Sequence, residues 1–148
     1  MRVKVRGVIV DGRRLLAVPE RRMGERSHMA LPGGRVGERE TLSEALVREL
    51  REETGLDITP QRLLYVAEVT APHRMQEVNL IFLAELNDSA GLGNQDFIDL
   101  AHDDWPLILP PIVREIARDL ETGWRDTPRW LGNVWDESLA RSRNNSTA

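Results

Sequence analysis

The first residues of the chain alternate between apolar and polar side chains, as they do in a strand with one buried face. This alternation covers residues 2–10, and an Asp-Gly pair at residues 11–12 then gives the signal of a tight hairpin turn. Residues 15–18 are all apolar and predict the second strand of that hairpin. The charged residues 20–28 predict an exposed loop, and the Leu-Pro-Gly-Gly run at residues 31–34 predicts a tight turn after it.

A helix with a signal at each end follows this turn. Thr41 lies three residues before Glu44, which is the spacing of a capping box. Residues that favour helices continue from Leu42 to Thr54, and Gly55 supplies the stop. We therefore expect a helix over residues 42–54.

The middle of the chain predicts further strands. Residues 63–69 and 78–86 are rich in apolar residues of the strand-forming kind, and the residues 71–74 between them favour a turn. Residues 87–94 predict a surface loop. The acidic stretch at residues 95–105 predicts no element.

The last third predicts a second amphipathic helix. It starts after the proline pair at residues 110–111, has apolar side chains at helical spacing up to Leu120, and stops at Gly123. Because helices and strands interleave, the fold class is α/β or α+β. We expect a single domain over residues 1–140 and a frayed tail over residues 141–148.

Composition and charge narrow the classes of function. With 20 Lys and Arg against 24 Asp and Glu, the net charge is −4, which gives no electrostatic footprint for a nucleic acid polymer. The chain has no cysteine, which excludes disulfides and thiolate chemistry. No apolar run is long enough for a membrane or secretory segment. These features predict a soluble cytoplasmic protein and leave small charged substrates open.

One segment carries a specific motif. Nine positions have fixed spacing: Gly34, Glu40, Arg48, Glu49, Leu50, Glu52, Glu53, Gly55 and Leu56. This pattern resembles the signature of the Nudix family of MutT-like hydrolases. The resemblance implies an α/β/α sandwich with a mixed β-sheet between helices. It also implies a phosphoanhydride hydrolase whose substrate is a nucleoside diphosphate linked to another moiety, such as a nucleoside triphosphate, an ADP-ribose-like molecule or a nucleotide sugar.

The helix geometry is consistent with a metal site. At roughly 100° per residue, Glu49, Glu52 and Glu53 fall within an arc of about 100°, beside a leucine stripe that faces the core. Carboxylates so close together repel one another unless a cation lies among them. Oxygen ligands without cysteine favour Mg²⁺, with Mn²⁺ as a substitute. The alternative for a Glu-rich helix is an ordinary solvated face, steadied by local ion pairs with arginine.

By resemblance, individual residues take roles in the site. The expected metal ligands are Glu49, Glu52, Glu53 and Glu40. The expected catalytic residues are Glu49, Glu52 and Arg48, of which Arg48 would hold the carboxylates. The expected substrate contacts are Gly33, Gly34 and His73.

Several points stay open at the level of sequence. The general base is either a signature glutamate or one of the acids downstream, namely Glu77, Asp96, Asp99, Asp103 and Asp104. The tryptophans of the last third are expected to pack that segment over the sheet, with base stacking as the alternative. A nucleotide-sensing module without catalysis is the alternative function. The resemblance also leaves a homodimer open, because many relatives are dimeric.

Overall fold

Strands and helices alternate along the chain, as the sequence predicts. The computed structural model describes residues 1–20, 28–73 and 75–136. The first half contains β1 (Arg2–Val8), β2 (Val10–Asp11), β3 (Arg14–Glu20), β4 (His28–Ala30), β5 (Gly33–Arg35), α1 (Leu42–Thr54) and β6 (Ile58–Val69). The second half contains β7 (Glu77–Leu86), the 3₁₀ helix η1 (Leu92–Asn94), β8 (Asp96–Asp99), β9 (Ile108–Leu109), α2 (Val113–Thr122) and β10 (Arg129–Asn133).

The strands form mixed sheets. Over the described residues there are two five-stranded sheets, of which the first has the order β10-β6-β7-β1-β5. In it β1 runs parallel to β7 and antiparallel to β5, while β6 runs antiparallel to β7. The second sheet has the order β2-β3-β4-β9, and β8 pairs with β3. The predicted mixed α/β class is confirmed, with two sheets where one was expected.

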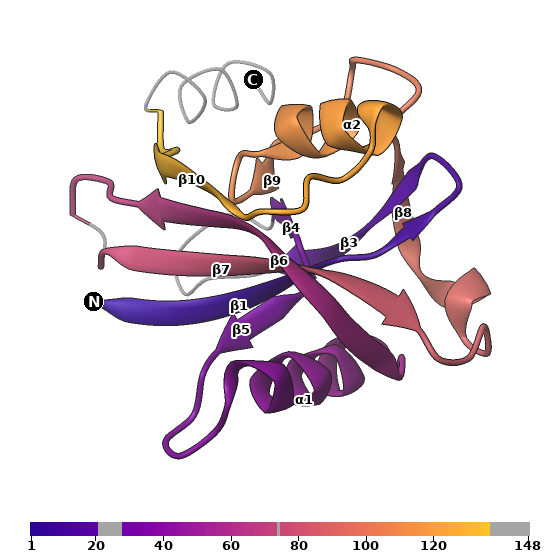
Figure 1. Ribbon diagram of the computed structural model, residues 1–148, viewed down its shortest axis with the longest axis horizontal. Coiled ribbons are helices and arrows are strands. Elements are labelled where there is room, and N and C mark those ends of the chain that lie inside the picture. Colours follow the sequence, from indigo (N-terminus) through magenta and orange to yellow (C-terminus); the bar gives the residue numbers. More distant parts are fainter. Residues whose placement is uncertain (21–27, 74, 137–148) are drawn as a thin grey trace.

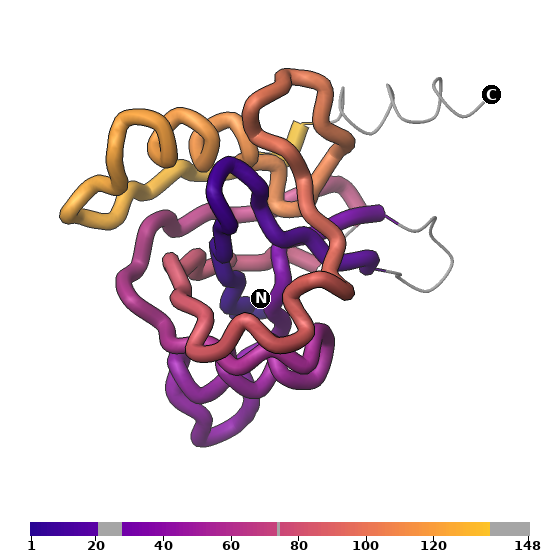
Figure 2. The backbone as a smooth tube through the Cα atoms, turned by 90° about the vertical axis from the view of Figure 1, so that its right-hand side faces the viewer, coloured from indigo at the N-terminus to yellow at the C-terminus, as the bar shows by residue number. Residues whose placement is uncertain are grey.

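The two long helices cover opposite sides of these sheets. Figures 1 and 2 show α1 below and α2 above the strands in both views. Leu46 and Leu50 of α1 are fully buried in one apolar cluster together with Val5. Ile116 of α2 is fully buried in a second cluster that includes Tyr65. Each helix thus has its own core, and the sheets lie between the two cores.

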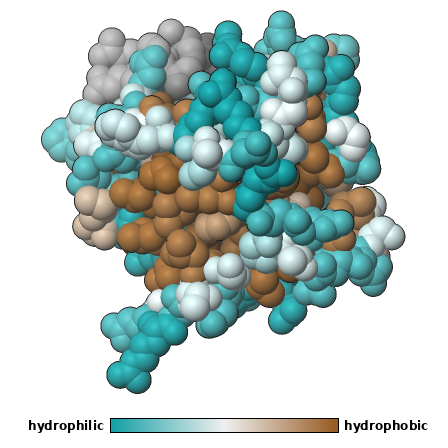
Figure 3. Space-filling model, viewed as in Figure 1, coloured by the Kyte–Doolittle hydropathy of each residue, from teal (hydrophilic) through white to brown (hydrophobic). Residues whose placement is uncertain are grey.

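The apolar surface is not fully covered by the helices. Figure 3 shows hydrophobic side chains gathered at the centre of the face seen in Figure 1, between polar areas. Leu80 and Phe82 of β7, which pack against the α1 cluster, are only partly buried. No helix in the part of the chain that is described is long and apolar enough to cross a membrane.

Helix α1 begins and ends as its sequence predicts. The Thr41 hydroxyl accepts a hydrogen bond from the Glu44 N–H at 3.1 Å, so one of the unpaired donors of the first turn is satisfied. Gly55 has φ +73 and donates its N–H to the Arg51 carbonyl. This left-handed conformation suits glycine because it has no Cβ. The caps fix which residues of α1 face the core.

A buried polar group ties α2 to the first sheet. The Tyr65 hydroxyl donates to Asp119 of α2 at 2.6 Å, and Arg129 of β10 forms an ion pair with the same carboxylate. Burial raises the pKa of Tyr65, and hydrogen bonding to Asp119 adds to this effect. The aromatic ring and the carboxylate therefore join β6, β10 and α2.

Several segments differ from the elements expected from sequence. Residues 33–35, expected as a turn, are the strand β5, while β4, β8, β9 and β10 lie in regions for which no strand was predicted. All are short, and β5, β8 and β10 are defined by pairing with a distant part of the chain. Trp130 of β10 is 75% exposed, so the expectation that it packs over the sheet is wrong. Trp105 and Trp124 do pack against the α2 cluster.

Two glycines test the C-cap of α1. Gly55 and Gly93 both have open space where a Cβ would be, but only Gly55 has a left-handed backbone. We expect Gly55→Ala to lower the free energy of unfolding by about 1 kcal/mol, because alanine is strained at positive φ. Gly93→Ala should leave it nearly unchanged. Urea unfolding of both variants measures the difference, and equal losses would contradict the assignment.

Candidate active site

Helix α1 presents its glutamates beside its buried leucine face. Glu49 is adjacent in sequence to the fully buried Leu50, and its side chain is 18% exposed. Glu52 lies on the outer side, with a side chain that is 60% exposed. Glu53 sits at the last turn and lines a cavity. The three predicted ligands therefore span the edge between the core and solvent.

Arg48 binds the carboxylates around it. Its Nε donates to Glu40 Oε2 at 2.6 Å and its Nη2 donates to Glu40 Oε1 at 2.8 Å, a two-pronged pair. Its Nη1 donates to Glu49 at 3.0 Å and to Glu52 at 3.3 Å. Hydrogen bonds from Arg48 and from the Gly37 N–H lower the pKa of Glu40 to about 2. The guanidinium thus gathers three of the four predicted ligands, as the resemblance implied for Arg48.

The backbone of β5 lies directly against these side chains. The Gly33 N–H donates to Glu53 Oε1 at 3.1 Å. A Cβ placed on Gly34 would lie 2.5 Å from Glu49 Cδ, closer than any real contact of this kind. Glycine is therefore required at position 34 by the packing of Glu49 on the strand, because any larger residue there would displace that carboxylate.

The environment of Glu53 favours its protonated form when no cation is near. Glu53 is exposed as a whole residue, but the protein that surrounds its carboxyl group partly desolvates it and raises its pKa to about 7, against the opposing effects of the Gly33 N–H and the charge of Arg6. Glu53 also lines a cavity of about 500 Å³ that Asp96 borders from β8. Gln95 also lines this cavity and donates to the Thr54 carbonyl at 2.9 Å. A cation at this place would favour the ionised carboxylate.

The donor set fits magnesium held in an open manner. Among residues 1–20, 28–73 and 75–136, no three Asp, Glu or His side chains converge as a closed metal cage requires. Magnesium does not need such a cage, because it keeps several waters and is held by one or two carboxylates together with phosphate oxygens. Glu49, Glu52 and Glu53 supply only carboxylate oxygens. They fit a site that a phosphate-bearing ligand completes.

The acidic residues predicted as possible general bases lie in different parts of the fold. Asp96 shares the cavity of Glu53. Glu77 is buried and lies 3.0 Å from the Lys4 ammonium. Asp99 accepts the Ala101 N–H at 2.8 Å and lies 3.6 Å from His102.

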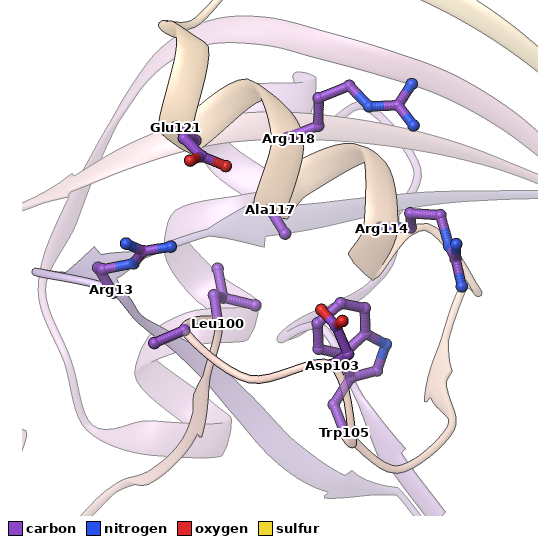
Figure 4. A pocket seen from close by; sticks show the side chains of 9 residues that line it. Arg13, Leu100, Asp103, Trp105, Arg114, Ala117, Arg118 and Glu121 are labelled. Atoms are coloured by element: carbon purple, nitrogen blue, oxygen red, sulfur yellow. The ribbon is translucent and has the colours of Figure 1, made fainter.

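Asp103 belongs to a different cavity. It lines a space of about 400 Å³ beside α2, together with Trp105 and with Arg114 and Arg118 of that helix. Figure 4 shows these side chains around the cavity, with the helix above and Trp105 below. None of the signature glutamates borders this cavity. Trp105 and Asp103 are therefore grouped with α2, away from α1.

Two histidines differ in their surroundings. His28, expected in an exposed loop, is 7% exposed, and its Nε2 lies 3.2 Å from Glu20. The exposed-loop expectation is wrong for His28, and residues 21–27 lie outside the described residues. His73 is exposed in the turn after β6 with φ +62. Its predicted contact with substrate stays a prediction.

Buried charges on β1 were missed at the level of sequence. Lys4 and Arg6 are 6% and 2% exposed, and both face away from the α1 cluster that holds Val5. Asn79 of β7 is 1% exposed and accepts a bond from Arg6 Nε at 3.3 Å. The alternation of charged residues and valine at the start of the chain is typical of a strand with one solvent-exposed face. The sequence carries no signal that distinguishes this case from a solvent-exposed polar face.

Comparison with known proteins decides the family. The model of the NUDIX domain matches residues 1–105. The chain belongs to the Nudix family. Its mixed α/β fold is similar to that of a solved structure, an ADP-ribose pyrophosphatase from Streptococcus suis. That structure has a TM-score of 0.63 and 20% sequence identity, and the match covers 89% of this chain and 98% of that one.

Curated Nudix relatives share sequence as well. An ADP-ribose pyrophosphatase of Methanocaldococcus jannaschii is 35% identical over 134 residues, covering 86% of this chain and 73% of the relative. An 8-oxo-dGTP diphosphatase of Proteus vulgaris is 34% identical over 83 residues, covering 53% and 72%. An 8-oxo-dGDP phosphatase of Danio rerio is 49% identical over 55 residues, which is 37% of this chain but only 16% of that protein. The chain is thus a Nudix hydrolase, of the class that acts on phosphoanhydride bonds.

The raised pKa of Glu53 predicts a pH-dependent stability. The unfolded carboxyl loses its proton near pH 4.5, while the folded one keeps it up to about pH 7. In this window the folded state binds more protons, so rising pH destabilises it. Glu53→Gln, which stays neutral, should lack this loss. In magnesium-free buffer, the wild type should therefore lose stability relative to Glu53→Gln between pH 5 and pH 8, measured by urea unfolding. If the difference in free energy of unfolding between the wild type and Glu53→Gln did not change with pH, the environment described for Glu53 would be contradicted.

Proposed function

We propose that this Nudix hydrolase cleaves the phosphoanhydride of a nucleoside diphosphate linked to another moiety, with Mg²⁺ as its cofactor and Mn²⁺ as a substitute. The observation that carries this proposal is the contact of the Gly33 N–H and the Gly34 backbone with Glu53 and Glu49. It brings the carboxylates of α1 and the backbone of β5 to one place beside a cavity. A nucleoside triphosphate, an ADP-ribose-like molecule and a nucleotide sugar all contain the bond in question.

Each residue of the site has a proposed role. Glu49, Glu52 and Glu53 would hold the cation, and Glu40 would act on them through Arg48, to which it is bound at 2.6 Å. When bound, magnesium neutralises charge on the phosphate oxygens and activates the attacking water. Support for magnesium comes from the all-carboxylate donor set and from the exposed position of Glu52, where phosphate and water have access.

The water that attacks must lose a proton to a nearby base. The Glu52 side chain is 60% exposed, against 18% for Glu49 and 16% for Glu40, and Asp96 borders the cavity of Glu53. The ion pair of Glu77 and the α2 cavity of Asp103 favour structural roles for those two acids. We therefore place the base among Glu52 and Asp96, with Glu49 held more tightly by Arg48.

Substrate contacts are proposed for β5, called the glycine strand because it carries Gly33 and Gly34, and for the turn after β6. The backbone of Gly33 and Gly34 allows a close approach of phosphate, because neither residue has a side chain in the way. His73 is proposed as a further contact from the turn after β6. The names of the two relatives of which the match covers more than two thirds, an ADP-ribose pyrophosphatase and an 8-oxo-dGTP diphosphatase, support nucleotides as the substrate class.

Loss of individual carboxylates tests the catalytic role. We expect Glu52→Gln and Glu53→Gln to lower magnesium-dependent kcat/KM by about a hundredfold or more, since each removes charge that stabilises the transition state. Glu44→Gln is the matched control. It makes the same change of side chain on the same helix, but in the first turn, at the end opposite to Glu52 and Glu53. Turnover of a nucleotide panel is the measurement. A nucleotide-sensing module would bind nucleotides with no turnover in any form, and equal turnover in all forms would reject the proposed site.

Product masses test which bond is broken. Water adds across a phosphoanhydride, so each product keeps a phosphoryl group and one product takes up the oxygen of water. With ¹⁸O-labelled water, we expect a labelled phosphoryl group and two phosphorylated fragments from ADP-ribose or a nucleotide sugar. From a nucleoside triphosphate we expect a nucleotide together with pyrophosphate or phosphate. Mass spectrometry of the panel measures this. Release of an unphosphorylated nucleoside would show cleavage of an ester bond and contradict the reaction class.

A further inference from the structure

Arg6 of β1 is a buried cation whose contacts lead to the glycine strand. Its guanidinium donates to the Leu31 carbonyl at 2.8 Å and to Asn79 Oδ1 at 3.3 Å, and it lies 3.5 Å from Glu20. Arg6 is 2% exposed, so these contacts replace water. A buried ion pair is seldom the most stable choice for a core position, because desolvation offsets its attraction. Stability alone therefore does not explain why a charged residue occupies this buried position, and we look for another role.

The contacts of Arg6 hold the chain just before the glycine pair. The guanidinium holds the Leu31 carbonyl, and the Gly7 N–H donates to the Pro32 carbonyl at 2.8 Å. Arg6 and Gly33 are direct partners in the pairing of β1 with β5. Three successive residues, from Leu31 to Gly33, are thus tied to β1, and the first of these ties depends on a side chain.

The hydrogen bond from Arg6 to the Leu31 carbonyl affects the position of Glu53, a proposed metal ligand. The N–H of Gly33 is directed to Glu53 at 3.1 Å and not to a neighbouring strand. Its direction is set by the Pro32–Gly33 peptide, whose carbonyl accepts from the Gly7 N–H, and by the Leu31–Pro32 peptide before it, whose carbonyl accepts from Arg6. We propose that Arg6 is a positioning residue: its guanidinium fixes the Leu31 carbonyl and thereby the Gly33 N–H that orients Glu53. This inference rests on the proposed function of Glu53.

Lys4 provides a matched comparison on the same strand. It lies two residues before Arg6, faces the same side and is 6% exposed. Its ammonium lies 3.0 Å from Glu77 and 3.9 Å from Glu20, and within the described residues it has no bond to Leu31. Both side chains are buried cations of one cluster. Of these two side chains, only that of Arg6 donates to Leu31, just before the glycine strand, because a guanidinium donates in several directions at once and an ammonium is a single point.

The experiment compares Arg6→Lys with Lys4→Met. Calorimetric titration with Mn²⁺ alone, without nucleotide, measures metal affinity, and NMR hydrogen exchange measures protection of the Gly33 N–H. For Arg6→Lys we expect metal affinity to fall about tenfold, the effect of losing one hydrogen bond of a charged group, and Gly33 exchange to become faster. Lys4→Met should keep both values within about twofold of the wild type, even where it lowers the melting temperature.

A second variant covers the case in which Arg6→Lys does not fold. Asn79→Leu removes the partner of Arg6 Nε, and it also removes a buried Nδ2 that has no hydrogen bond, so we expect it to fold. It should weaken Mn²⁺ binding and Gly33 protection in the same direction as Arg6→Lys, by less. Unchanged binding and exchange in the folded Arg6 or Asn79 variants would overturn the inference, as would equal losses in Lys4→Met. If Glu53→Gln instead kept full turnover, the proposed function would fail, while Gly33 exchange would still report on the Arg6 contact.

Discussion

The close contact between the backbone of β5 and the carboxylates of α1 is the constraint on which the rest of the site depends. A Cβ on Gly33 would lie 1.9 Å from the Val5 carbonyl oxygen, and one on Gly34 would lie 2.5 Å from Glu49 Cδ. The strand therefore fits between β1 and the helix only because both residues lack side chains. This contact is also what turns a helix with a Glu-rich face into a site, because it places a backbone N–H and a cavity beside Glu53.

Charge in the site is organised around two arginines. Arg48 lies on the solvent side of α1 and binds Glu40, Glu49 and Glu52. Arg6 is buried on the other side of the glycine strand and reaches Glu20 and the Leu31 carbonyl. The first arginine offsets the repulsion between neighbouring carboxylates, and the second holds the strand against which they pack. Gathering so many charged groups in one place lowers the stability of the folded protein, as is common at functional sites.

Local signals predicted α1 and the signature, whereas the surroundings of the site depend on pairing across the chain. Thr41 and Gly55 cap the helix as their sequence indicates, because capping involves only residues within one turn. The strand β8 was not predicted, since it is defined by pairing with β3 more than seventy residues earlier, and this pairing is what brings Asp96 to the cavity of Glu53. The burial of Arg6 could not be predicted either. A strand with alternating charge looks the same in sequence whether its polar face meets water or a second sheet.

The central claim is that the carboxylates of α1 beside the glycine strand form a divalent metal site. Anomalous X-ray diffraction from crystals soaked with Mn²⁺ and a slowly hydrolysed nucleotide analogue tests this claim most directly, because it locates the metal without reference to activity. We expect an anomalous peak within bonding distance of carboxylate oxygens of Glu49, Glu52 or Glu53, in contact with a phosphate of the nucleotide. A peak elsewhere, or a bound nucleotide with no metal beside these glutamates, would contradict the account.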